Sequence, residues 1–142
     1  MATDNCVTIT GNLTRDVEVR YGNNGTAVGR IGIAHNRRWW SKADNDWREE
    51  VSFFNVVVFG DIAENIEETL SKGDRVVVHG RLQQRSWETD EGEKRSVVEI
   101  VADDIAPSLR WATATVKRVE KEKVGGSRPP VRNEPPEDEE TF

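Results

Sequence analysis

The side chains best suited to chemistry in this sequence are arginines that stand beside large aromatic rings. The run Arg37–Trp40 holds two arginines and two tryptophans, and Arg85 lies two residues before Trp87. An exposed ring can stack on a nucleobase, while a guanidinium can bind the neighbouring phosphate. These segments therefore indicate an interface for single-stranded nucleic acid, and recognition by stacking tolerates any base sequence.

The distribution of charge matters more here than its total. The net charge is -6, which by itself argues against nucleic acid as a partner. Residues 20–42 contain five basic residues and no acid, however, whereas residues 61–68 contain four acids and no base. A chain with separated charge can present one basic surface, although each run alone is also typical of a solvated face.

The elements that must position these side chains are mostly strands. Runs rich in β-branched and aromatic residues predict five strands, over residues 6–10, 26–39, 51–59, 75–87 and 95–105. Helical spacing predicts a helix over 62–70, with Asp61 as its N-cap, Glu64 at the capping-box position and Gly73 after its end. One short helix between the third and fourth strands is the element order of an all-β, five-stranded OB-fold barrel.

The two faces of the later strands differ in character. In 75–87 the core-like face carries Val76, Val78 and Leu82, and the opposite face carries arginines and Trp87. Strand 51–59 is apolar on both faces. Its pattern fits equally well with a fully buried set of phenylalanines or with one face meeting a ligand or another subunit, and the residues concerned are Phe53, Phe54 and Phe59.

Composition divides the chain into a domain and a tail. Four of the five prolines follow residue 128, where large apolar residues are few. We expect residues 1–110 to form the folded domain, 111–116 an extra strand, and 117–142 a disordered acidic tail. No apolar run is long enough to span a membrane, and no signal peptide is visible, so we expect a soluble cytoplasmic protein.

Three other classes of function remain to be weighed. The sequence lacks the common enzyme motifs, and His35 and His79 fit strand positions better than a metal site, so we expect no enzyme activity, metal or cofactor. Residues 22–25 match the loop of an RNA-binding KH domain, but their flanks indicate strands. An adaptor that acts only through its tail is the third alternative, and it would bind no nucleic acid.

The sequence resembles the bacterial single-stranded-DNA-binding protein family. The matching stretches are residues 11–28, 54–82 and 85–95, together with an acidic tail that ends in Phe142. Residues 108–116 resemble the actinobacterial branch in particular. The tail is short and its tip lacks the aliphatic residue and proline of relatives, which is typical of a specialised second paralogue.

The resemblance implies roles for individual residues. It places base stacking on Trp39, Phe53, Phe59 and Trp87, and phosphate contacts on basic residues of the barrel. Pattern and resemblance together give these candidate DNA-binding residues: Trp39, Trp40, Phe53, Phe59, Trp87, Arg20, Arg30, Arg37, Arg38, Lys72 and Arg85.

The resemblance also implies partners. Family members are homotetramers, and in this branch segment 111–116 clamps a neighbouring subunit. First strands pair across a two-fold axis, which would bring Cys6 near its own copy. The tail recruits replication, recombination and repair proteins to nucleoid-associated DNA, and its candidate partner-binding residues are Glu137, Asp138, Glu139, Glu140 and Phe142.

Overall fold

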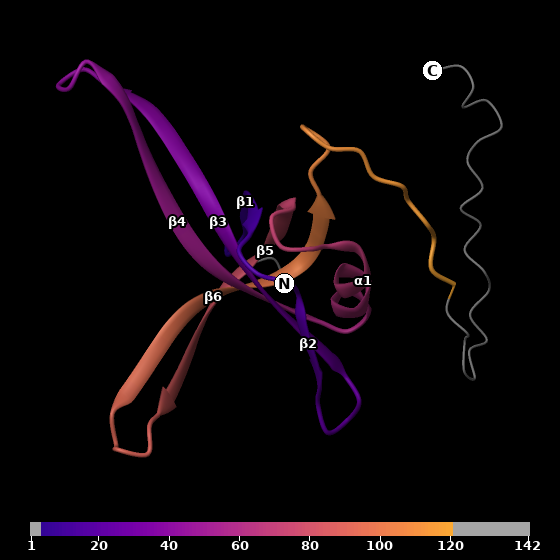
Figure 1. Ribbon diagram of the computed structural model, residues 1–142. Helices are drawn as coiled ribbons and strands as arrows, with labels where there is room; N and C mark the ends of the chain where they lie inside the picture. Colours follow the sequence, from indigo (N-terminus) through magenta and orange to yellow (C-terminus); the bar gives the residue numbers. More distant parts are fainter. Residues whose placement is uncertain (1–3, 121–142) are drawn as a thin grey trace.

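The protein is a small barrel of strands with two long projecting hairpins. A computed structural model describes residues 4–120, and Figure 1 shows the arrangement of its elements. In chain order these are β1 (Val7–Leu13), β2 (Glu18–Tyr21), β3 (Ala27–Ser41), β4 (Asp46–Phe59), α1 (Asp61–Thr69), β5 (Arg75–Glu88) and β6 (Lys94–Pro107).

The sheet closes on itself because β1 pairs with two other strands. Residues Val7 to Asn12 lie antiparallel to β5, and Asn12 and Leu13 also pair with β3. The order around the barrel is β1-β5-β6-β4-β3, with β2 added beside β3. Strands β4 and β6 run parallel where they meet. This closed five-stranded barrel with one short helix confirms the predicted OB-fold.

The barrel interior is filled by aliphatic side chains from alternate strand positions. Helix α1 packs Ala63 and Ile66 against this core, together with Leu70 just beyond its end. Burial of these apolar surfaces, worth about 25 cal/mol per Å², holds the barrel together. The largest fully buried side chains are Ile31, Ile33, Val56, Val58, Val76, Val78 and Ile100. Within residues 4–120, no helix is long and apolar enough to cross a membrane.

A β-bulge marks the point where β5 and β6 leave the barrel. The pairing register shifts between His79 and Gly80, which leaves Asp103 as an extra residue in β6. A Cβ atom at Gly80 would lie 2.1 Å from the carbonyl oxygen of Val101, so only glycine allows this close approach. Because a bulge bends its strand, this one helps direct the hairpin away from the barrel.

Two hairpins therefore extend beyond the barrel as arms (Figure 1). The β3–β4 arm (residues 35–52) ends near Trp40, which pairs with Trp47. The β5–β6 arm (residues 83–99) ends near Trp87, which pairs with Arg95. Figure 1 shows the two arms pointing in different directions. Side chains on both faces of an arm are exposed, because no second layer covers either face.

Several predicted boundaries were wrong. Asp61 is already helical, and the N-cap is Gly60 with φ 82, a left-handed conformation that glycine adopts readily. Strand β2 was not predicted, and β4 begins at Asp46 rather than at 51 because the hairpin continues almost to its turn. Leu82, predicted to be in the core, is exposed because β5 has left the barrel there for the arm.

The extra strand predicted over residues 111–116 is not formed in this chain. The segment is exposed and has no regular secondary structure. A strand needs a partner for its backbone hydrogen bonds, and none of the strands between residues 4 and 120 pairs with this segment. Its proposed role as a clamp therefore depends on a second subunit.

Candidate nucleic-acid interface

Strand β4 turns two phenylalanines away from the core. Phe53 and Phe59 are 72% and 53% exposed, whereas Phe54 packs against the buried cluster. Val56 and Val58 fill the barrel from the same face as Phe54. The second apolar face of this strand, which the sequence pattern did not assign, is therefore an outward aromatic surface.

Arg20 lies in one cross-strand row with Phe59. The register of β2 and β3 places Arg20 opposite Val28, and that of β3 and β4 places Val28 opposite Phe59. Directly opposed residues project to the same face of a sheet. Arg20 is paired with Glu18 at 2.8 Å, but this ion pair is exposed and contributes little. The Arg20 guanidinium can therefore leave Glu18 and bind a phosphate near Phe59.

Arg30 and Arg85 meet at a buried carboxylate. Glu99 is only 6% exposed. Its Oε1 atom lies 3.4 Å from Nε of Arg85, and its Oε2 atom lies 3.8 Å from Nη1 of Arg30. The Arg85 guanidinium also lies 4.8 Å from the ring centroid of Trp87. Three different strands supply these groups, so closure of the barrel is what brings them together.

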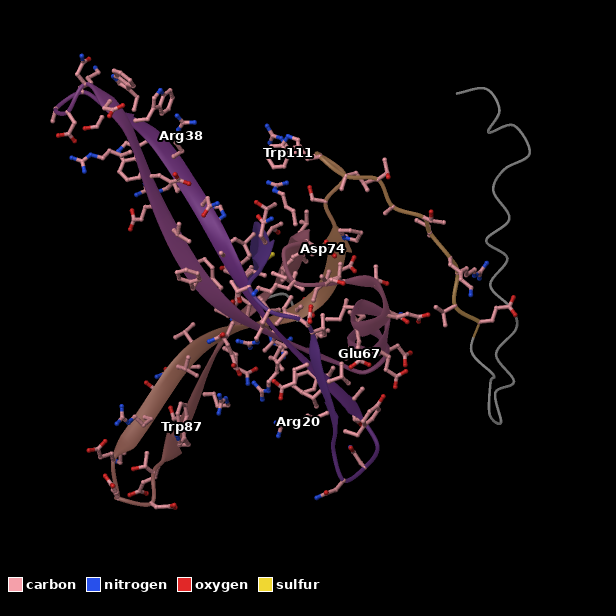
Figure 2. The ribbon with its side chains drawn as sticks, in the orientation of Figure 1. Arg20, Arg38, Glu67, Asp74, Trp87 and Trp111 are labelled. Carbon is pink, nitrogen blue, oxygen red and sulfur yellow. The ribbon has the colours of Figure 1, made fainter. Side chains whose placement is uncertain are left out.

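A recess of about 310 Å³ lies beside Glu99. Its lining includes Trp87, Asn55 and a further arginine, Arg15. The Arg15 guanidinium lies over Gly32, where an added Cβ atom would be 3.5 Å from Nη1. Figure 2 shows Trp87 and Arg20 below the barrel in this view, far from Arg38 on the β3–β4 arm.

The end of the β3–β4 arm carries a second aromatic cluster. The rings of Trp40 and Trp47 meet edge to face, with centroids 5.6 Å apart. The guanidinium of Arg38 lies 4.7 Å from the ring centroid of Trp47. Because Trp40 is directly opposite Trp47, both project to the face of the hairpin that also carries Phe53.

Arg37 and Trp39 occupy the other face of the same arm. Trp39 is opposite Arg48, which by alternation places it away from Phe53. The Arg37 guanidinium lies 4.3 Å from the Trp39 ring centroid and also donates a 2.8 Å hydrogen bond to Glu50. Of the predicted stacking residues, Trp39 therefore lies on one face of the β3–β4 hairpin, and Trp40 and Phe53 lie on the other.

Lys72 lies apart from both arms, in the loop between α1 and β5. Its backbone N–H donates a 2.8 Å hydrogen bond to Asp16, so this loop is held beside the turn that carries Arg15. The other predicted cations all lie on strands, so Lys72 is the one that lies in a loop.

A profile of the Single-strand binding protein family matches residues 4–108. The chain belongs to this family. Similar proteins include the single-stranded DNA-binding protein of Paenarthrobacter aurescens, which is 44% identical over 128 residues, covering 89% of this chain and 75% of the relative. That of Mycobacterium tuberculosis H37Rv is 44% identical over 132 residues, covering 91% and 80%.

A solved member of the single-strand binding protein family shares the fold. The structure described as the Plasmodium falciparum SSB complex with ssDNA has a TM-score of 0.70 and 24% sequence identity to this chain. The alignment covers 76% of this chain and 97% of the other. At this identity the likeness establishes the barrel architecture.

Sequence reasoning missed three residues of this candidate interface. Trp47 falls between the predicted strands 26–39 and 51–59, although hairpin pairing places it opposite Trp40. Arg15 stands beside Asp16 in a turn and carries no periodic signal. Glu99 is one acid in an apolar run, and nothing local to it indicates two arginine partners.

A small polar cluster lies on the outer face of β1. Thr8 Oγ1 and Nδ1 of His79 form a 2.7 Å hydrogen bond, and Sγ of Cys6 lies 3.6 Å from Nε2 of His79. No group of three potential metal-ligating side chains occurs within residues 4–120. The predicted partner-binding residues of the tail lie outside the described residues.

Proposed function

We propose that this chain binds single-stranded DNA with little dependence on base sequence and protects it during replication, recombination and repair. The names of the similar proteins support this proposal. The observation that carries it is the exposure of all five tryptophans of the chain. Four of them have a guanidinium between 4.3 and 4.8 Å from the ring centroid.

In the proposed mechanism, aromatic rings stack on the bases and cations bind the phosphates. A guanidinium covers one side of Trp39 or Trp87, so a base can stack on the other side. Stacking of this kind contributes about 1–3 kcal/mol per base. The same guanidinium remains close enough to attract the adjoining phosphate, whose negative charge it neutralises. Such contacts read the ring surface and the backbone, which every nucleotide shares.

We further propose that the functional unit is a homotetramer in the cytoplasm, associated with the nucleoid. The edge of β1 from Val7 to Gly11 faces no strand on the side away from β5, within the described part of the chain. An open edge of this kind can pair with the same strand of a second subunit. The acidic tail would then recruit genome-maintenance proteins to the bound DNA.

Titration of the tryptophan fluorescence with oligo(dT) of increasing length tests the proposal. We expect quenching that saturates, with affinity rising with length until the interface is filled. A parallel competition with RNA of the same base sequence should displace the DNA poorly. Unchanged fluorescence together with no change in the anisotropy of a labelled oligonucleotide would overturn the proposal. Preferential binding of RNA would indicate an RNA-binding protein instead.

A further inference from the structure

The outer face of β1 and β5 brings together the single cysteine of the chain and one of its two histidines. Cys6 immediately precedes β1, and His79 lies on β5 directly opposite Thr8. The Sγ atom of Cys6 is 3.6 Å from Nε2 of His79, and both side chains are exposed. A cysteine thiolate and a histidine imidazole are the usual ligands of structural Zn²⁺ sites in proteins.

The spacing of the two ligand atoms is that of a tetrahedral zinc site. A Zn–S bond of about 2.3 Å and a Zn–N bond of about 2.0 Å that meet at the tetrahedral angle hold sulfur and nitrogen about 3.5 Å apart. The observed separation of 3.6 Å therefore needs almost no adjustment. A hydrogen bond between a thiol and an imidazole gives a similar separation, so the two arrangements must be distinguished by experiment.

Two neighbouring side chains hold the pair in this orientation. Oγ1 of Thr8 lies 2.7 Å from Nδ1 of His79. In the tautomer with its proton on Nδ1, the ring donates to Thr8 and keeps the lone pair of Nε2 for a metal. Metal-bound histidines almost always donate their other ring N–H in this way. The Asn5 side chain exchanges hydrogen bonds of 2.8 and 2.9 Å with the backbone of Leu82, which keeps Cys6 beside β5.

One chain supplies half of a structural zinc site. Such sites have four protein ligands, and no third metal-ligating side chain joins this pair between residues 4 and 120. In the same part of the chain, the edge of β1 from Val7 to Gly11 is open on the side away from β5. Pairing of this edge with a second copy creates a two-fold axis, and residues near such an axis meet their own copies. An axis beside Cys6 brings together two sulfurs and two imidazole nitrogens.

We propose that two copies of this chain share one Zn²⁺ ion, which is held by Cys6 and His79 of each copy. The metal joins the two first strands and stabilises the pair of subunits. Thiols stay reduced in the cytoplasm, so Cys6 is available there as a ligand. This inference rests on the self-association proposed above. It does not rest on DNA binding, because Cys6 and His79 lie outside both arms.

Cobalt is the probe for this site, because tetrahedral Co²⁺ absorbs visible light and a thiolate ligand adds a charge-transfer band. The full chain is reduced, freed of metal with EDTA and titrated with Co²⁺, and Zn²⁺ is then added. We expect both absorptions to saturate at one Co²⁺ per two chains and to disappear when Zn²⁺ displaces the cobalt. Zn²⁺ should also raise the melting temperature, because an ion that binds the folded state stabilises it.

Variants of the two ligands show whether the pair holds the metal. Cys6→Ser should abolish the charge-transfer band, and His79→Asn should abolish saturation at one metal per two chains. Neither variant should gain stability from Zn²⁺. His35→Asn is the matched control, because it removes the other histidine, whose Nδ1 bonds to the carbonyl oxygen of Thr10 at 2.8 Å. This control should bind Co²⁺ as the unaltered protein does, and melting of the metal-free variants shows that each is folded.

The possible results separate the shared metal site from the proposed function. Co²⁺ bound without a charge-transfer band, bound at one per chain, or bound equally by Cys6→Ser would indicate an adventitious ion only and would overturn the site. No binding by a protein that light scattering shows to be a dimer or tetramer would also overturn it, leaving a hydrogen-bonded thiol and the proposed function intact. A monomer would overturn both the site and the proposed self-association, while titration with oligo(dT) tests DNA binding separately.

Discussion

Trp39 and Phe53 project from opposite faces of the hairpin formed by β3 and β4. Trp39 is paired with Arg48, and Phe53 with Ala34, so alternation directs their side chains to different sides. A DNA strand that stacks on both rings must therefore pass around the arm rather than lie along one face of it. This path also brings the strand past Trp40 and Trp47 at the end of the arm.

The separation of the two rings predicts additive losses of affinity. Trp39→Ala and Phe53→Ala should each weaken binding of single-stranded DNA by about 1–3 kcal/mol, and Trp87→Ala should do the same. The double variant Trp39→Ala/Phe53→Ala should lose the sum, since the two rings share no contact. Fluorescence anisotropy of a labelled oligonucleotide measures each loss.

Leu109→Ala is the control for this series, because it removes an exposed aliphatic side chain that lies on neither arm. It should bind as the unaltered protein does. A double variant that binds no more weakly than the worse single variant would mean that both rings serve one base, which contradicts a path around the arm.

The fold was predictable because its signals are local. Alternating apolar and polar residues, bounded by turn residues, predict the strands. The spacing of Ile62, Ile66 and Leu70 predicts α1. Short β2 was missed because four residues give too little pattern. The faces of the long hairpin were not predictable, since a single bulge reverses the parity and only the observed register settles it.

The site was predictable only in part, because its centre is made by closure of the barrel. Residues such as Trp39 and Trp87 carry a local signal, which is a ring beside arginines. The grouping of Arg30 and Arg85 around Glu99 has none, since the three residues come from β3, β5 and β6. Sequence spacing cannot show which side chains meet across a sheet.

Two cations should respond differently to salt. The slope of log affinity against log salt concentration is negative. Lys72→Ala should make this slope less negative by about 0.7, because one phosphate contact is lost from a single strand. Arg85→Ala should make the slope less negative and should also lower the stability of the fold, because Glu99 loses its nearest partner. Titrations across a series of salt concentrations, together with thermal melting, measure both effects.

Lys117→Ala serves as the control, since it removes a charge that lies beyond the barrel and both arms. Its salt slope should equal that of the unaltered protein. If Lys72→Ala gave the same slope as this control, Lys72 would not contact phosphate.

Segment 111–116 should act as a clamp between subunits. In this chain Trp111 is 74% exposed, with the guanidiniums of Arg75 and Arg110 at 4.8 and 4.9 Å from its ring centroid. Truncation after Arg110 should therefore lower the melting temperature or shift tetramers toward dimers. Truncation after Glu120 keeps the segment and is the matched control. Light scattering and melting curves that are identical for both truncations would exclude the clamp.

Cys6 offers a test of how the first strands meet. It is exposed and immediately precedes β1, so pairing of two copies of this strand about a two-fold axis would place it near its own copy. Mild oxidation should then produce a dimer band on a non-reducing gel, and Cys6→Ser should remove that band. A reduced thiol is the ordinary state in the cytosol. A monomer band that persists under oxidation would show that the two thiols do not meet.

The last prediction concerns the acidic tail, which lies outside the described residues. Four acids at 137–140 stand just before the terminal Phe142. A partner with a basic rim around an apolar pocket would suit such a tip, because the ring supplies burial and the carboxylates supply steering and charge-assisted hydrogen bonds. The alternative is a tail that acts through charge alone, by keeping the protein soluble or by competing with DNA for the barrel's cations.

Deletion of Phe142 separates these two roles, because it leaves every side-chain carboxylate in place. A peptide of residues 134–142 should bind a genome-maintenance protein in a calorimetric titration, and the peptide without Phe142 should bind at least tenfold more weakly, as expected for loss of one buried aromatic side chain. Equal binding of the two peptides would leave only the electrostatic role, since the ring would then contribute nothing to recognition.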